Sequence, residues 1–81
     1  MPKKFFGEAL RSARESRKLS QEKLAFKAGI SRNSVGSLEK GEFVATIDTL
    51  FKIADGLDML PEDLITETRL RMSRNASNSK R

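Results

Sequence analysis

The 81-residue chain is long enough for one small domain with a modest core, and it leaves no room for a separate catalytic domain. It contains no cysteine and no histidine, which excludes disulfides, thiolate metal sites and the commonest general base and metal ligand. The remaining candidates for catalysis (carboxylates, lysine and serine) form no recognisable constellation, so an enzyme is not expected.

The formal net charge of +5 is divided into three blocks along the chain. Residues 1–41 carry ten Lys or Arg against four Glu, residues 42–65 carry one Lys against six acidic residues, and residues 66–81 carry five Lys or Arg against one Glu. A basic block of this kind suits a polyanion such as nucleic acid. The solubility of a small basic protein explains the same charge, so both interpretations stay open on charge alone.

No apolar run approaches the ~20 residues that are needed to span a bilayer. The apolar stretch of MPKKFFGEAL is interrupted by Glu8 too early for a signal peptide. With no cysteine to favour an oxidising compartment, the sequence predicts a cytoplasmic protein without a membrane partner.

The first helix is expected from Phe5 to about Arg17, after a frayed basic lead over residues 1–4. Polar residues occupy one side of this segment, as in an amphipathic helix at the surface of a small domain. The apolar stripe on the other side consists of Phe6, Ala9, Leu10 and Ala13.

Two short helices are expected next, over about Gln21–Lys27 and Arg32–Glu39. Ser20 and Ser31 precede them and can cap them, because a serine hydroxyl accepts a hydrogen bond from an unpaired backbone N–H at a helix start. Gly29 falls where a helix ends in the left-handed conformation, which glycine adopts without a Cβ penalty. The outer face of the second short helix is small, polar or basic, which indicates a surface that contacts a polar partner.

A fourth helix is expected after the capping residue Thr46, and a fifth begins at Pro61, a residue favoured at the first helical position. Leu64 and Ile65 point inward from the fifth helix. The fourth has an apolar stripe that consists of Ile47, Leu50, Phe51, Ala54 and Leu57. No alternating strand pattern occurs, so the sequence predicts an all-α fold, a compact arrangement of five helices.

The end of the chain is rich in Ser, Asn and cations and has lost helical periodicity. It is predicted to be a basic, disordered tail over residues 69–81, attached to a domain over residues 1–68 that includes the fifth helix. The tail either adds an electrostatic contact with phosphates or is a solvated terminus, and we favour the second.

Four stretches carry a characteristic pattern of spaced residues: LSQE-x-LA from Leu19, GISR from Gly29, LE-x-G from Leu38, and I-x-x-L-x-x-IA-x-x-L from Ile47. In this pattern the chain resembles the Cro/lambda-repressor-like (Xre-type) helix-turn-helix family of DNA-binding proteins, over roughly residues 6–65. Its size and layout also resemble the small controller proteins of restriction–modification systems, and phage-type regulators.

The resemblance implies that the second short helix lies in the major groove of double-stranded DNA while the first braces it across the backbone. It assigns base contacts to Arg32, Asn33, Gly36 and Ser37. It assigns phosphate contacts to Gln21, Ser31, Ser34, Lys40 and the backbone around Phe43.

The chemistry of these side chains supports the assignment independently. Arginine can bind guanine O6 and N7, and asparagine can bind adenine N6 and N7, each with ~1–3 kcal/mol of base discrimination. For Arg32, contact with a base and contact with a phosphate are equally supported, whereas base contact is favoured for Asn33 and Ser37. Gly36 costs ~1 kcal/mol in a helix relative to alanine, so either that cost is tolerated or the missing side chain lets the helix approach the bases.

The family pattern also pairs Arg14 with Glu39, in a partly buried ion pair that would fix the reading helix on the first helix. The alternative is two independent surface charges, and we favour the pair. Phe43 and Val44 place apolar surface in a connector, where they either cover the core or contribute to a subunit contact.

A single helix-turn-helix unit reads few base pairs, so a homodimer on two half-sites is expected. Some of the apolar residues near the fifth helix must close the monomer core, and the acidic block leaves this end available to protein partners, RNA polymerase among them. The candidate subunit contact consists of Met59, Leu60, Leu64 and Ile65. No cofactor, metal or small-molecule ligand is indicated.

These features together predict a sequence-specific, dimeric transcription regulator of (pseudo)palindromic operator DNA, located in the cytoplasm with the nucleoid. The controller of a restriction–modification operon is the narrower candidate. An antitoxin or prophage switch protein of the same fold would use the same chemistry. A protein-interaction adaptor is the alternative from another class, and it would not need a polar and basic outer face on the reading helix.

Overall fold

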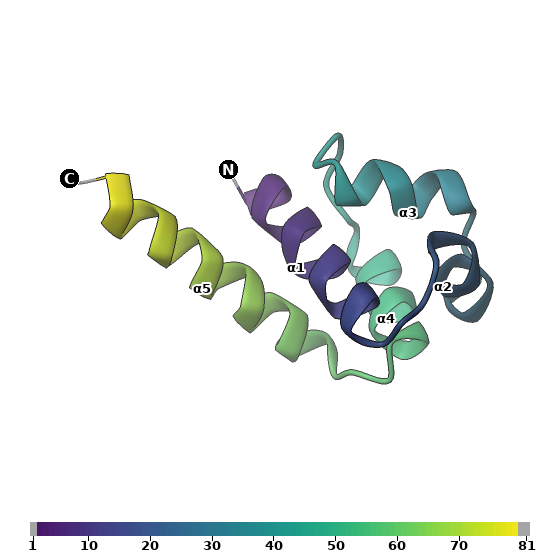
Figure 1. Ribbon diagram of the computed structural model, residues 1–81. Coiled ribbons are helices and arrows are strands. Elements are labelled where there is room, and N and C mark those ends of the chain that lie inside the picture. The colour runs from purple at the N-terminus through teal and green to yellow at the C-terminus, as the bar shows by residue number, and fades with distance from the viewer. Residues whose placement is uncertain (1, 80–81) are drawn as a thin grey trace.

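Five α-helices form the fold, and residues 2–79 are the part of the chain that the computed structural model describes. The helices are α1 (Pro2–Ser16), α2 (Gln21–Ala28), α3 (Arg32–Glu39), α4 (Ile47–Gly56) and α5 (Pro61–Ser79). Figure 1 shows α1 and α5 side by side, with α2, α3 and α4 gathered on the other side of α1. No strand occurs within residues 2–79, and the predicted all-α fold class is confirmed.

The predicted caps set the helix boundaries in the middle of the chain. The hydroxyls of Ser20, Ser31 and Thr46 accept hydrogen bonds of 3.0, 3.0 and 3.1 Å from the backbone N–H three residues further on. Gly29 ends α2 with a φ of 73°, in the left-handed region, and its N–H bonds to carbonyls of the last helical turn. The α2–turn–α3 geometry is therefore encoded locally.

All five helices contribute apolar side chains to one shared core. Smaller or partly buried side chains such as Ala25, Leu19 and Ile30 complete its edges. The largest fully buried side chains are Leu10, Leu24, Val35, Leu38, Ile53, Leu57 and Leu64.

The predicted stripe of α4 is partly wrong. Leu50 and Ala54 are buried as expected, but Ile47 and Phe51 are 70% and 57% exposed, and Ile53 is fully buried instead. At about 100° per residue, Leu50, Ile53 and Ala54 form one continuous stripe, which leaves Ile47 and Phe51 on its flank. Apolar character alone therefore did not identify the buried face.

The first helix begins earlier than predicted, at Pro2 and not at Phe5. Proline suits the first helical position because the N–H that it lacks would have no partner within the helix. Phe5, which lies outside the predicted stripe, is buried.

The last helix, α5, continues through residues that the sequence predicted to be disordered. No glycine or proline follows Pro61, so nothing in the sequence stops the helix. Arg71 extends the contact with α1, because its guanidinium lies 3.9 Å from the carboxylate of Glu8. The prediction of a disordered tail is therefore corrected for residues 69–79, which are helical. The last two residues of that predicted tail lie outside the described residues.

The first two charge blocks of the sequence lie on different helices, and the described part of the third continues α5. Residues 1–41 contain α1, α2 and α3, whereas residues 42–65 form the connector, α4 and the start of α5. Among the described residues, no helix is long and apolar enough to cross a membrane. The same residues contain no cluster of acidic side chains that could hold a metal ion.

Candidate nucleic-acid interface

The outer face of α3 forms one wall of a polar hollow. Arg32 and Asn33 are exposed in it, whereas Gly36 and Ser37 are half-buried. The hollow thus brings together all four residues predicted to contact bases and two of those predicted to contact phosphates. Its lining consists of Gln21, Arg32, Asn33, Gly36, Ser37 and Lys40.

Two buried side chains fix the direction in which this polar face points. Val35 and Leu38 have no exposed surface and pack in the core. Because an α-helix turns by about 100° per residue, Asn33, Ser37 and Lys40 lie on the opposite side of α3. Rotation of α3 about its axis would expose the two core residues, so the polar face is held outward.

The start of α3 carries two of the predicted phosphate contacts, Ser31 and Ser34. The Ser31 hydroxyl accepts a hydrogen bond of 3.0 Å from the N–H of Ser34, and the two hydroxyl oxygens lie 2.9 Å apart. The two side chains therefore hold each other at a helix start, where unpaired backbone N–H groups favour an anion.

The connector after α3 carries the other phosphate candidates, Lys40 and Phe43. Gly41 turns the chain here with a φ of 73°, a conformation that side-chain-bearing residues rarely adopt. Lys40 is exposed, and Phe43 is 44% exposed and does not pack against the core, so the alternative in which Phe43 covers the core is wrong. Candidate phosphate contacts consequently lie at both ends of α3.

A buried ion pair holds α3 on α1 behind the polar face. Arg14 Nε donates to Glu39 Oε2 at 2.6 Å, and Arg14 Nη2 donates to Glu39 Oε1 at 3.1 Å. Arg14 Nη1 donates to the carbonyl of Leu19 at 2.8 Å, so all three guanidinium nitrogens are bonded. The two side chains are only 10% and 5% exposed, and the predicted pair is confirmed.

The same carboxylate binds a third helix. Gln21 Nε2 donates to Glu39 Oε1 at 3.0 Å, which links the start of α2 to the end of α3. The hydrogen bonds that Arg14 donates to Glu39 raise the pKa of Arg14 above its usual value, although burial opposes this effect. The sequence predicted Gln21 only as a phosphate contact, because nothing local shows that residues 18 positions apart meet.

Gly7 is a second structural residue of this region that the sequence analysis missed. A Cβ atom at Gly7 would lie 2.5 Å from the carbonyl oxygen of Glu39 and 2.6 Å from that of Leu38. Glycine therefore lets α1 touch the backbone of α3. The signal was present in the sequence, since an isolated glycine within an amphipathic helix often marks a close approach of two backbones.

Comparison with known proteins places this arrangement in a family. The helix-turn-helix model HTH_3 matches residues 10–65, which include the whole of α2, α3 and α4. The chain belongs to the helix-turn-helix family. The resemblance seen in the spaced residues of the sequence is thereby confirmed.

Relatives of this helix-turn-helix protein include control proteins. The chain is 35% identical to Control protein C.BamHI of Bacillus amyloliquefaciens over 67 residues, which are 82% of this chain and 83% of that protein. It is 36% identical to Control protein C.SmaI of Serratia marcescens over 69 residues, or 85% and 82% of the two chains. The crystal structure of the restriction-modification controller protein C.AhdI from Aeromonas hydrophila matches with a TM-score of 0.74 and 39% identity, and covers 75% of this chain and 92% of that one.

The residues predicted to form the subunit contact do not share one environment in this helix-turn-helix protein. Leu64 is fully buried and Met59 packs against the core, so the prediction is wrong for Leu64. Leu64 faces inward on α5, and Ile65, about 100° further round the helix, is 51% exposed. Leu60 is 58% exposed and also remains available to a partner.

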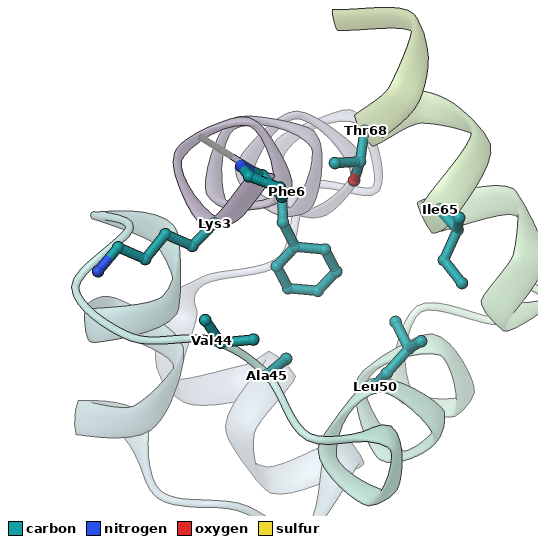
Figure 2. A pocket seen from close by; sticks show the side chains of 8 residues that line it. Lys3, Phe6, Val44, Ala45, Leu50, Ile65 and Thr68 are labelled. Atoms are coloured by element: carbon teal, nitrogen blue, oxygen red, sulfur yellow. The ribbon is translucent and has the colours of Figure 1, made fainter. Parts of the chain in front are cut away.

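An apolar hollow of about 180 Å³ lies between the start of α1, the connector, α4 and α5. Figure 2 shows the Phe6 ring pointing into it, with Val44 and Ala45 on one side and Leu50 and Ile65 on the other. Val44 is 70% exposed at this site, and the exposed Ile47 lies one turn from Leu50 on α4. Exposed apolar surface therefore continues outward from the hollow, on elements other than α3.

Proposed function

We propose that this helix-turn-helix protein regulates transcription by binding (pseudo)palindromic operator DNA as a homodimer, with α3 of each subunit in the major groove. The observation that carries this proposal is the polar hollow on α3. It presents Arg32, Asn33 and Ser37 on one outward face, and all three belong to the basic block of residues 1–41.

The roles of these side chains follow from their donor and acceptor groups. Asn33 can bind adenine N6 and N7, Arg32 can bind guanine or a phosphate, and Ser37 can bind either type of base edge. Gly36 offers only backbone surface. Phosphate contacts are proposed for Ser31, Ser34, Lys40 and the backbone at Phe43, at the two ends of α3.

We further propose that the regulated genes form a restriction–modification operon. The support is the similarity to control proteins C.BamHI and C.SmaI and to the restriction-modification controller protein C.AhdI, over most of each chain. Sequences upstream of restriction and methylation genes are therefore the first candidates for the operator.

Selection of bound sequences from random double-stranded DNA tests the main proposal. We expect two related half-sites in inverted orientation, and binding that weakens steeply with salt because phosphate contacts release counterions. Asn33→Ala should relax the preference at one base pair of each half-site. Lys40→Ala should instead lower the binding affinity for all DNA sequences by a similar factor. Binding without sequence preference and without salt dependence would exclude the proposed function.

The second copy of the chain is proposed to dock on the apolar hollow and the surface around it. A twofold operator requires a twofold dimer, in which the same patch of both subunits forms the contact. The exposed apolar residues of α4 and α5 suit such a contact, since the core does not use them. They are Ile47, Phe51 and Ile65, together with Val44 of the connector and Leu60, which directly precedes α5.

Phe51→Glu is expected to convert the dimer into a monomer, because an unpaired carboxylate would be buried in the contact. Sedimentation at micromolar concentration measures the change, and operator affinity should fall with it. The control is Phe26→Glu, since Phe26 is 84% exposed on α2, away from the hollow. Phe26→Glu should remain dimeric. A Phe51→Glu protein that still sediments as a dimer would place the contact elsewhere.

A further inference from the structure

The side chain of Gln21 lies between two features of α3, the carboxylate of Glu39 and the bare backbone of Gly36. Its Nε2 donates to Glu39 Oε1 at 3.0 Å. A Cβ atom at Gly36 would lie 3.7 Å from Gln21 Oε1 and 3.9 Å from Gln21 Nε2, and among the described residues it would have no other contact within 4 Å outside α3 itself. The amide of an α2 residue therefore covers the place that a side chain at position 36 would occupy.

The orientation of this amide is fixed by chemistry. A carboxylate only accepts hydrogen bonds, so the amide must turn its nitrogen towards Glu39. Glu39 is itself held by two bonds from Arg14 and is only 5% exposed, so it cannot follow a rotating amide. One N–H of Gln21 is thereby used, and the second N–H and the oxygen Oε1 stay available.

This remaining pair of groups sits in the hollow that α3 presents. Gln21 lines the same hollow as Asn33, Gly36 and Ser37. An amide N–H beside an amide oxygen matches adenine, whose N7 accepts and whose N6 donates. A phosphate has only acceptors and would leave Oε1 without a donor.

We propose that Gln21 is a base-reading residue of this protein, with a preference for adenine. It supplies from α2 the contact that Gly36 cannot make, and the Arg14–Glu39 pair positions its amide. This inference rests on the proposed function, because it requires α3 to lie in the major groove. It replaces the phosphate contact that the family pattern assigns to Gln21.

The test compares Gln21→Met with the parent protein on the selected operator and on each of its single-base-pair variants. Methionine keeps the length of the side chain but has no amide groups. We expect a loss of about 5- to 150-fold in discrimination at one A·T base pair of each half-site, with the other preferences unchanged. The control is Glu22→Gln, since Glu22 is exposed, lies outside the α3 hollow and should leave every preference unchanged.

A second variant tests the part played by Gly36. Gly36→Met should displace the Gln21 amide and remove the preference at the same base pair, and it should have no further effect on that preference in the Gln21→Met background. If Gly36→Met prevents all binding, the Gln21→Met measurement decides alone.

The outcomes separate this inference from the proposed function. A parent protein that selects no operator would overturn both. The parent protein could select a clear operator while Gln21→Met lowers the affinity for every operator variant by the same factor. That result would overturn only the base-reading role of Gln21 and would support a phosphate contact instead.

Discussion

Gly7→Ala is expected to lower the free energy of unfolding, although alanine is the better helix former. The new Cβ would meet the carbonyl oxygens of Glu39 and Leu38 at 2.5 and 2.6 Å, and both belong to the backbone of α3, which cannot turn aside as a side chain could. Overpacking of this kind costs about 1–3 kcal/mol. Since each kcal/mol shifts the melting temperature of a domain of this size by about 4–8 °C, calorimetry would detect the loss.

Gly36→Ala is the matched control, because Gly36 is also a helical glycine. Its Cβ would meet only the Gln21 amide, at the ordinary contact distances of 3.7 and 3.9 Å. The expected result is a gain of up to about 1 kcal/mol from helix propensity. Equal stabilisation by both substitutions would show that α1 does not touch α3 closely at Gly7. A higher operator affinity of Gly36→Ala would also exclude the idea that glycine serves a closer approach of α3 to the bases.

Glu39→Ala is expected to destabilise the protein by about 3–5 kcal/mol, since it leaves a buried guanidinium without its partner. The total stability of a small domain is only about 5–15 kcal/mol, so this is a large fraction of it. Arg14 is 10% exposed and loses both carboxylate bonds. Urea unfolding, followed by circular dichroism, measures the change.

The control for Glu39→Ala is Arg11→Ala. Arg11 pairs with Glu15 at 3.0 Å, but these side chains are 65% and 55% exposed. Exposed pairs of this type contribute about 0.3–0.5 kcal/mol. The raised pKa of Arg14 means that its contribution is complete below the usual arginine value and is lost only above it, so neutral to mildly alkaline buffers should give the same difference. An unchanged unfolding midpoint for Glu39→Ala would show that the pair does not support the fold.

Elements that depend on neighbouring residues could be predicted from the sequence. The caps at Ser20, Ser31 and Thr46 and the left-handed Gly29 involve contacts within a few residues, and all four are present. The faces of the helices depend on what packs against them. Ile47 and Phe51 are as apolar as Leu50, and only the tertiary arrangement decides which of them is buried.

The candidate site likewise contains features that could be predicted from the sequence and contacts that could not. The family pattern located the outward residues of α3 and the Arg14–Glu39 pair, because both follow from spaced positions of the sequence. The meeting of Gln21 with Glu39 and Gly36 is a consequence of how α2 crosses α3, which no periodicity encodes. Likewise, the length of α5 depends on its contact with α1 as well as on its composition.

The separation of charge between α1–α3 and α4 has a kinetic consequence. Residues 1–41, which form α1–α3, carry ten Lys or Arg against four Glu, whereas residues 42–65 carry one Lys against six acidic residues, so we expect the molecule to have an electric dipole. In the field of a polyanion such a dipole experiences a torque, so the protein turns before it makes contact. Fewer collisions are then lost to unproductive orientations, and this advantage disappears as added salt shortens the range of the field.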